Sequence, residues 1–140
     1  MRILFAADGS KYTKKALAFL ATHENFGGET DEIAVVHVQP PVPPRVKTMV
    51  GAAIVNDYHQ EEARKVLAPI ERFLKRHPAP FHTSWVVGSP SGEILRAAKR
   101  EKAHMIVMGT HGHGLISRAL MGSVAQKVVA DADIPVLLVK

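Results

Sequence analysis

Residues 105–114, with the sequence MIVMGTHGHG, are the most informative stretch of the chain about its fold. Met105–Met108 has the length and apolar character of a buried strand, and a loop with three glycines follows it at once. Gly122 and Ser123 come further on, at the expected start of a helix. Glycines let backbone N–H groups approach an anion closely, and a helix N-terminus adds unpaired donors and partial positive charge. The segment therefore predicts a phosphate-bearing ligand, with a nucleotide as the first candidate.

The rest of the chain alternates short apolar runs with segments of helical periodicity. Such runs are typical of parallel strands that are covered on both faces, joined by right-handed crossovers. We expect strands at residues 3–7, 33–38, 81–87, 105–108 and 135–139, and helices at 11–23, from 52 or 56 to 76, at 90–101 and at 123–131. This order predicts an α/β protein, a three-layer α/β/α sandwich around an open, twisted, mainly parallel sheet of five strands. Residues 1–140 are expected to form a single domain.

Prolines mark two irregular places. Residues 39–51 begin with a proline-rich run and are predicted to form a long irregular segment, because this run fits neither a helix nor a central strand. Pro69 lies inside the apolar stripe of the second helix and removes a backbone donor. We therefore expect a kink or an irregular start in that helix.

Composition excludes several classes of function. The chain has no cysteine, so disulfides, thiolate metal sites and thiol catalysis are excluded. No signal-like segment and no apolar run of membrane-spanning length occurs, which predicts a cytoplasmic protein without a membrane partner. The formal net charge is +5, but the basic residues are dispersed over helix faces and aromatic residues are few, so nucleic acid is not expected as a partner. In a second interpretation, the positive field draws a small polyanionic ligand to the protein.

The place of a ligand follows from the predicted sheet. Ligands of open parallel sheets bind beyond the carboxyl ends of the strands, where the strand order reverses. The first and fourth strands are expected to be neighbours there, so Asp8 would lie opposite the glycine loop. No lysine followed by serine or threonine comes after the glycines, and Asp8-Gly9-Ser10 lacks the glycines of a dinucleotide fingerprint. The loop therefore has neither of the two common nucleotide signatures.

The spacing of these glycines resembles the ATP-binding pattern of the universal stress protein family. In that pattern Gly109 is followed after two residues by Gly112, and after nine more by Gly122 and Ser123. The resemblance extends over essentially the whole chain, from the opening strand that ends in Asp-Gly-Ser to the closing segment 133–139. The proline-rich run after Val38 is its least similar part.

The resemblance implies an adenine nucleotide alpha hydrolase-like sheet of order 3-2-1-4-5, ATP as the ligand and magnesium on its phosphates. It also implies a homodimer that pairs through the last strand, Val136 to Val139, whose edge would otherwise be exposed. Asp8 would accept hydrogen bonds beside the ribose, Val38 would hold the adenine edge through its backbone, and Ser123 would meet the terminal phosphates. The full set of expected ligand-binding residues is Ala6, Ala7, Asp8, Val38, Met108, Gly109, His111, Gly112, His113, Gly114, Gly122, Ser123, Val124 and Ala125.

Plainer interpretations stand beside these. The glycine loop can be a tight strand-to-helix connection, and Asp8 can be a turn residue at the start of the first helix. His111 and His113 could bind a metal with Asp8, but two histidines one residue apart are a weak signal, and we expect no metal held by side chains alone. Arg118 fits a phosphate contact and a surface cation equally well. His37, in a strand, fits a hydrogen-bonded core histidine.

The sequence offers phosphate positioning without an evident group to activate a nucleophile, so we expect no catalytic residues. The expected function is that of an ATP-holding regulatory homodimer that signals or protects under stress. One alternative is an enzyme on the same scaffold, a slow ATPase or a nucleotidyl-transfer enzyme. Another is a module that binds AMP, a cyclic nucleotide or a protein partner.

Overall fold

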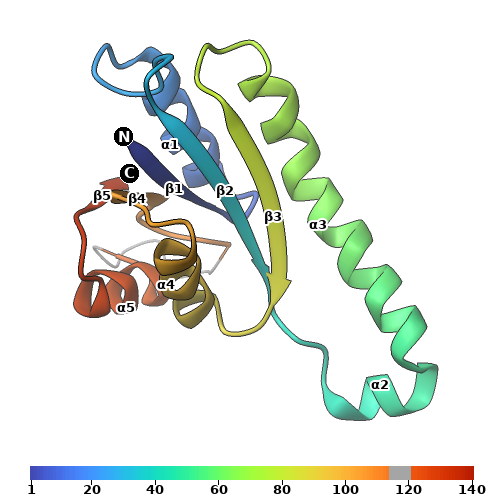
Figure 1. Ribbon diagram of the computed structural model, residues 1–140. Helices are drawn as coiled ribbons and strands as arrows, with labels where there is room; N and C mark the ends of the chain where they lie inside the picture. Colours follow the sequence, from blue (N-terminus) through green and yellow to red (C-terminus); the bar gives the residue numbers. More distant parts are fainter. Residues whose placement is uncertain (114–120) are drawn as a thin grey trace.

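All five strands lie parallel in one twisted sheet, in the order β3-β2-β1-β4-β5 (Figure 1). The computed structural model describes residues 1–113 and 121–140. The strands are β1 (Arg2–Ala7), β2 (Glu32–Gln39), β3 (Phe81–Val87), β4 (Met105–Gly109) and β5 (Val136–Val139). The helices are α1 (Lys11–Thr22), α2 (Pro44–Val50), α3 (Ala52–Leu74), α4 (Pro90–Arg100) and α5 (Ser123–Asp131). The predicted fold class and strand order are thereby confirmed.

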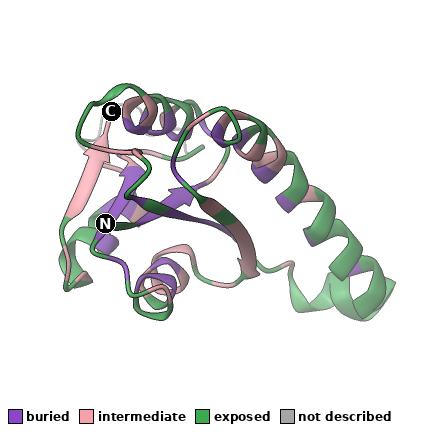
Figure 2. Ribbon diagram, turned by 45° about the horizontal axis from the view of Figure 1, so that its top comes forward, coloured by how far each residue is buried: buried purple, intermediate pink, exposed green. Residues whose placement is uncertain are grey.

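Helices cover both faces of the sheet, and strand residues alternate between them. Phe5, fully buried in β1, packs in a cluster with residues of α1 and α3. Its neighbour Leu4 points to the other face and packs in a second cluster with residues of α4 and α5. Figure 2 shows the central strands as the most buried part of the molecule. Because β1 is buried on both faces, a continuous apolar run was the right signal for it.

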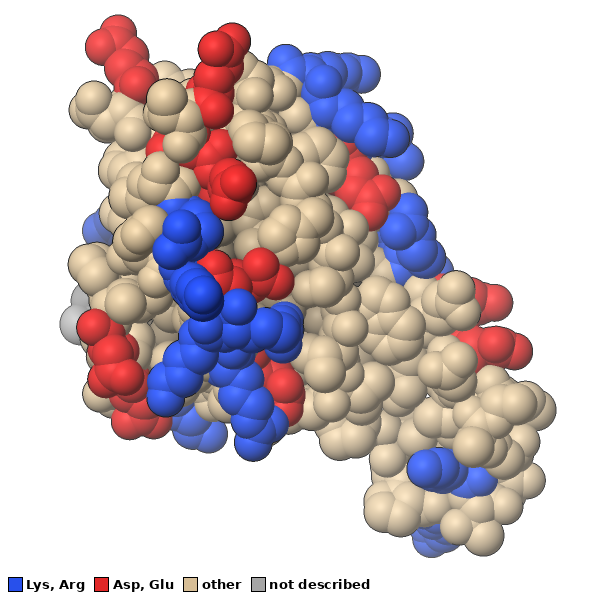
Figure 3. Space-filling model, viewed as in Figure 1, with Lys and Arg blue, Asp and Glu red and all other residues tan. Residues whose placement is uncertain are grey.

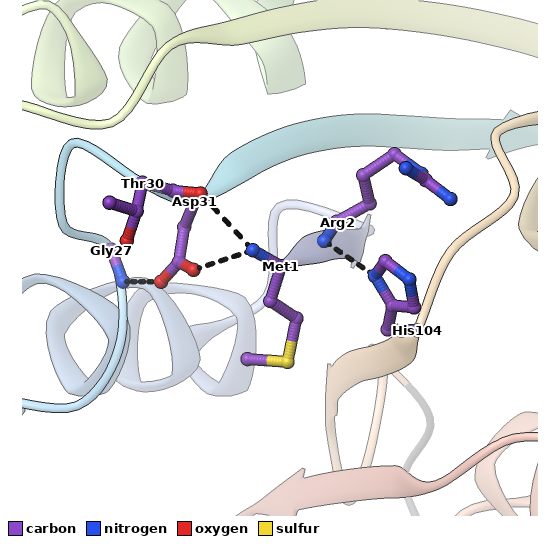
Figure 4. Close-up of polar contacts among 6 residues, drawn as sticks. All are labelled: Met1, Arg2, Gly27, Thr30, Asp31 and His104. Atoms are coloured by element: carbon purple, nitrogen blue, oxygen red, sulfur yellow. Dashed lines mark hydrogen bonds and ion pairs between the residues drawn. The ribbon is translucent and has the colours of Figure 1, made fainter.

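Polar contacts fix the amino ends of the strands against each other (Figure 4). The Met1 ammonium donates to the Thr30 carbonyl and to Asp31 Oδ1, each at 3.1 Å. Asp31 Oδ2 accepts from the Gly27 N–H at 3.0 Å. The Arg2 N–H donates to His104 Nδ1 at 2.9 Å. These bonds set the registers of β1 against β2 and β4, and the registers decide which loops meet at the opposite end of the sheet.

The proline-rich segment differs from the prediction. Residues 39–51 were expected to be irregular, yet Pro44–Val50 forms α2. Pro44 is the first residue of this helix, where the missing N–H costs nothing because it would have no partner within the helix. Gly51, with φ of 86°, ends α2 and precedes α3. A helix therefore still forms in this segment, and it begins at Pro44, after the earlier prolines.

The helix α3 continues through Pro69 without interruption, so the expected irregular start at that residue is wrong and the expected kink stays a prediction. Leu67 and Ile70, on either side of Pro69, are buried against the sheet. Pro69 itself is exposed, so the carbonyl that loses its helical partner can be hydrated. Packing on the opposite face outweighs the lost hydrogen bond. Within the described ranges, no helix combines the length and apolar character needed to cross a membrane.

Candidate functional site

A cavity of about 560 Å³ lies at the carboxyl ends of β1, β2 and β4, bounded also by the starts of α4 and α5. This volume is in the ordinary range for sites that hold small molecules. The strand order reverses between β1 and β4, because the chain moves from β1 outward to β2 and β3 before returning to β4. The cavity therefore occupies the predicted position in the sheet.

The structure brings together every expected ligand-binding residue that it describes. Residues from the ends of β1, β2 and β4, from the glycine loop and from the first turn of α5 share this one cavity. Those lining it are Ala6, Ala7, Asp8, Val38, Met108, Gly109, His111, Gly112, His113, Gly122, Ser123, Val124 and Ala125. Gly114 and Arg118 lie outside the described residues.

Further residues line the cavity outside that set. They are Thr13, Val36, His37, Pro40, Pro90, Ile94, Thr110, Met121 and Gln126. Pro90 follows Gly88 and Ser89, which come directly after β3 at the edge of the sheet where ligands bind. This position is the sequence feature that could have indicated Pro90. Pro40 comes directly after β2 and Thr110 directly after β4, at the edge of the sheet where a ligand was expected. No sequence pattern indicates that Thr13 and Ile94 line the cavity, because their positions there depend on how α1 and α4 pack on the sheet.

Asp8 is held by the first turn of α1. Its Oδ1 accepts hydrogen bonds from the Ser10 N–H at 2.9 Å and from Thr13 Oγ1 at 2.7 Å. Thr13 Oγ1 in turn accepts from the Asp8 N–H at 3.0 Å. The other oxygen, Oδ2, has no hydrogen-bond donor among residues 1–113 and 121–140. The carboxylate is therefore fixed through one oxygen and can accept from a ligand through the other.

The glycine spacing has a steric reason at each position. A Cβ on Gly112 would lie 2.7 Å from Asp8 Oδ2, and a Cβ on Gly109 would overlap the Cβ of Tyr12 in α1. A Cβ on Gly122 would lie 3.3 Å from the backbone of Thr110, whose carbonyl already accepts from the Gly122 N–H at 2.7 Å. The three glycines therefore permit close approach of the loop to β1, to α1 and to the start of α5.

Helix α5 begins at the cavity without a side-chain cap. Gly122 is its N-cap, and no side chain among the described residues accepts from its first N–H groups. Ser123, Val124 and Ala125 form this first turn and line the cavity. Unpaired N–H groups at a helix start, together with the partial positive charge there, form an anion-binding arrangement.

The two histidines of the glycine loop have separate contacts within the protein. His113 Nε2 donates to the Asp8 carbonyl at 2.7 Å. His111 lies beside the ring of Tyr12, with 5.0 Å between ring centroids, and its Nδ1 is 2.9 Å from Thr110 Oγ1. No group of three or more possible metal ligands occurs among the described residues. In this arrangement the histidines fix the loop against β1 and α1.

His37 is buried beneath the cavity, and its hydrogen bonds define its tautomer. Nδ1 lies 2.6 Å from the Ala7 carbonyl, which can only accept, so Nδ1 carries the proton. Nε2 then accepts from the Gln39 side-chain N–H at 2.8 Å. Burial lowers the pKa of His37 below 6.5, although the Ala7 carbonyl and the Asp8 charge act in the opposite direction. The interpretation of His37 as a hydrogen-bonded core histidine is confirmed.

Comparison with known proteins gives one consistent family. A sequence model described as the Universal stress protein family matches residues 1–140. A universal stress protein of Thermus aquaticus is 36% identical over 139 residues, covering 99% of this chain and 97% of the relative. The universal stress protein MJ0531 of Methanocaldococcus jannaschii is 31% identical over 140 residues, covering 99% of this chain and 81% of the relative.

Solved structures agree with the sequence relatives. The structure of the protein MJ0577 superposes with a TM-score of 0.80 at 25% identity, covering 99% of this chain and 94% of that one. A universal stress protein from Archaeoglobus fulgidus in complex with dAMP superposes with a TM-score of 0.71 at 26% identity. That match covers 100% of this chain and 98% of the other. The fold and the sequence thus point to the same family.

Proposed function

This chain belongs to the universal stress protein family, and we propose that it binds ATP in the cavity between β1, β4 and α5 and holds it without rapid turnover. The uncapped start of α5, facing the cavity beside Gly122, carries this proposal. Its first-turn N–H groups would take the terminal phosphates, and the Ser123 hydroxyl would add a donor. Mg²⁺ would then bind to the phosphates and not to protein side chains.

The nucleoside would lie against the apolar residues of the cavity. Ala6, Val36, Val38, Ile94 and Met108 supply an apolar lining for the base. The backbone of Val38 would hold the adenine edge. Asp8 Oδ2 would accept from the ribose hydroxyls, because Oδ1 is already occupied by protein donors. In this proposal, base, sugar and phosphates each have suitable partners in the cavity.

A holding role is favoured over an enzymatic one by the contacts of the histidines. His113 Nε2 donates to a backbone carbonyl and His111 packs on Tyr12, so both side chains have a structural role in holding the glycine loop. His37 is neutral and keeps both ring nitrogens in protein hydrogen bonds. We propose that the protein acts in a stress response as a nucleotide-loaded regulator. The edge of β5 would pair with that of a second copy to form a homodimer.

Isothermal titration of purified protein with ATP and Mg²⁺ tests the proposal. We expect saturable binding to wild-type protein and to Gly92→Ala, whose substitution falls in open space on α4. Gly122→Val should lose most of that binding, because the larger side chain pushes on the Thr110 backbone and displaces the loop. Absence of heat and of any thermal shift with millimolar Mg-ATP would contradict ATP binding.

AMP is the second candidate ligand, and the dAMP complex of the Archaeoglobus fulgidus relative favours it. A monophosphate would use the Asp8 and Val38 side of the cavity and would make fewer contacts with α5. Titrations with AMP and with a cyclic nucleotide separate these cases, as does native mass spectrometry of the protein as purified. Equal affinity for AMP and ATP would mean that α5 contributes nothing to binding and would favour AMP. Steady-state phosphate release that falls in Asp8→Ala would instead favour the ATPase.

A further inference from the structure

The exposed apolar side chains of this protein gather on one projecting element, which we call the arm and define as residues 44–61. Five of the eight large apolar residues that are exposed within the described ranges lie on it: Val46, Met49, Val50, Ile54 and Tyr58. Met49 is 79% exposed and Ile54 is 59% exposed. Scattered exposed apolar residues need no explanation, but a continuous set of them marks an interaction surface.

The arm is helical and extends away from the sheet. It comprises α2 and the first turns of α3, and both ribbon views show it projecting beyond the end of β3 (Figures 1 and 2). No residue of α2 is buried. The Gly51 N–H donates to the Lys47 carbonyl at 2.9 Å and the Gly51 carbonyl accepts from the Val55 N–H at 3.3 Å, so the two helices are joined by a hydrogen-bonded turn. The apolar residues are therefore presented on a defined surface.

Charges on the arm are separated along its length. Arg45 and Lys47 lie on α2, whereas Asp57 and Glu61 lie further along α3. Figure 3 shows Lys and Arg side chains at the tip of the projecting part, with Asp and Glu side chains nearer the body of the molecule. Asp57 and Glu61 share a helix face with Ile54 and Tyr58, because the four positions are spaced by three and four residues. None of the four charged residues forms an ion pair within the described part of the chain. The surface thus combines exposed apolar side chains with basic residues on α2 and acidic residues on α3, where Lys65 lies one turn beyond Glu61.

We propose that two copies of this chain associate through their arms, packed antiparallel about a two-fold axis near Ile54. In this arrangement the apolar side chains of the two arms pack together. Arg45 and Lys47 of each copy face Asp57 of the other, with Glu61 beyond it. A surface with opposite charges at its two ends is complementary to itself when turned about such an axis. The self-complementary charge pattern is what identifies a second copy as the occupant.

The contact is smaller than a standard interface, which uses some 20–30 residues a side. We therefore expect the association to be weak and the fraction of associated chains to depend on protein concentration. It involves neither the nucleotide cavity nor the edge of β5. If β5 pairs with a second copy as proposed above, the arms add a second interface and join such dimers into larger assemblies. The two interfaces can be removed separately.

Cysteine cross-linking tests the arm contact directly, because the chain has no cysteine of its own. In Ile54→Cys the two sulfurs would lie close to the two-fold axis, so mild oxidation should form a covalent dimer. The matched control is Lys99→Cys, an exposed position on α4 far from the arm in sequence. We expect the arm variant to cross-link at least about tenfold faster than the control, because the contact raises the effective concentration of the two thiols.

Charge exchange then tests the identity of the occupant. Adding Asp57→Lys to Ile54→Cys should slow cross-linking, and adding Arg45→Glu together with Lys47→Glu should restore it. Thermal unfolding should change little in each variant, since all of these positions are exposed. A dimer that persists in sedimentation after Ile54→Glu would be formed through the β5 contact. The arm contact and the β5 contact can therefore be tested independently.

Two results would overturn the proposal. The first is cross-linking of Ile54→Cys no faster than that of Lys99→Cys. The second is loss of cross-linking in Asp57→Lys without restoration by the charge exchange. Binding of the wild-type protein to phosphatidylglycerol vesicles, abolished by Met49→Glu in the absence of arm cross-linking, would assign the arm to a membrane surface instead.

Discussion

His113 donates a hydrogen bond of 2.7 Å to the main-chain carbonyl of Asp8, across 105 positions of sequence. The bond joins the glycine loop that follows β4 to the loop that follows β1. Both loops line the cavity, and Asp8 is itself fixed by Ser10 and Thr13. One histidine side chain therefore sets the spacing between the two halves of the proposed nucleotide site.

Replacing this histidine should weaken nucleotide binding more than it weakens the fold. In His113→Ala the glycine loop loses its contact with Asp8 and must be ordered by the ligand itself. We expect the dissociation constant for Mg-ATP to rise roughly fivefold to tenfold, which corresponds to about 1 kcal/mol, the usual net value of one hydrogen bond. Titration calorimetry measures the change, with His82→Ala, an exposed histidine elsewhere, as the control. Unchanged affinity would show that the loop is held without this bond.

Gly112→Ala should disturb the site through Asp8. The added Cβ would lie 2.7 Å from Asp8 Oδ2, the oxygen that we propose accepts from the ribose. We expect the affinity for Mg-ATP to fall at least about tenfold, since a ligand hydrogen bond to a charged group is worth about 1.5–3 kcal/mol. The midpoint of unfolding should change little, because Gly112 is on the surface. Normal binding in this variant would remove Asp8 from the proposed site.

Gly109→Ala should instead destabilise the fold. Its Cβ would overlap the Cβ of Tyr12, so β4 and α1 would have to move apart. We expect the free energy of unfolding to fall by about 1–3 kcal/mol, as for other overpacked sites. Urea unfolding measures it against Gly92→Ala, which has open space and should be neutral or more stable by up to about 1 kcal/mol. Equal stability of the two variants would contradict the close packing of β4 on α1.

The buried His37 should make stability depend on pH. Burial lowers its pKa below the ordinary value of 6.5, so between the two pKa values the unfolded chain binds more protons than the folded one. Its contribution is therefore fully present above about pH 6.5, and stability falls as the pH drops from 6.5 toward the folded-state pKa. The slope from one such group is at most about 1.4 kcal/mol per pH unit. Unfolding of His37→Gln between pH 7 and 5 should show a flatter slope than wild type.

His59 offers a route to a more stable protein. It is 4% exposed in α3, and its Nδ1 has no hydrogen-bond partner among the described residues. A buried polar atom without a partner costs about 1–3 kcal/mol, and leucine removes that atom while keeping an apolar side chain there. We expect His59→Leu to raise the thermal midpoint, as measured by circular dichroism. A lower midpoint would mean that the ring contributes through packing, for example against Tyr58, whose ring centroid is 5.6 Å away.

Local sequence patterns were enough to predict the sheet and the position of the cavity. Continuous apolar runs such as Ile3–Ala7 identify strands that are buried on both faces, because hydrophobicity and strand length are properties of a few neighbouring residues. Parallel strands bring their carboxyl ends to one edge, so Asp8 and the glycine loop had to meet there once β1 and β4 were neighbours. The start of α5 at Ser123, directly after Gly122, was predicted from the same local pattern.

Contacts between distant segments could not be predicted in this way. The bond from His113 to the Asp8 carbonyl and the protonation of His37 on Nδ1 depend on which backbone groups the packed sheet brings beside each ring. The helix α3 continues through Pro69 because its opposite face is buried against the sheet. The helix propensity of proline alone takes no account of that packing. The arm forms from a proline-rich segment that looked irregular, and its exposed apolar face is visible only against the finished fold. The sequence specified the strands, the glycine loop and the edge where they meet, because those are set by short-range patterns. Packing specified the partners of each polar group and the surface left uncovered, because those depend on the whole chain at once.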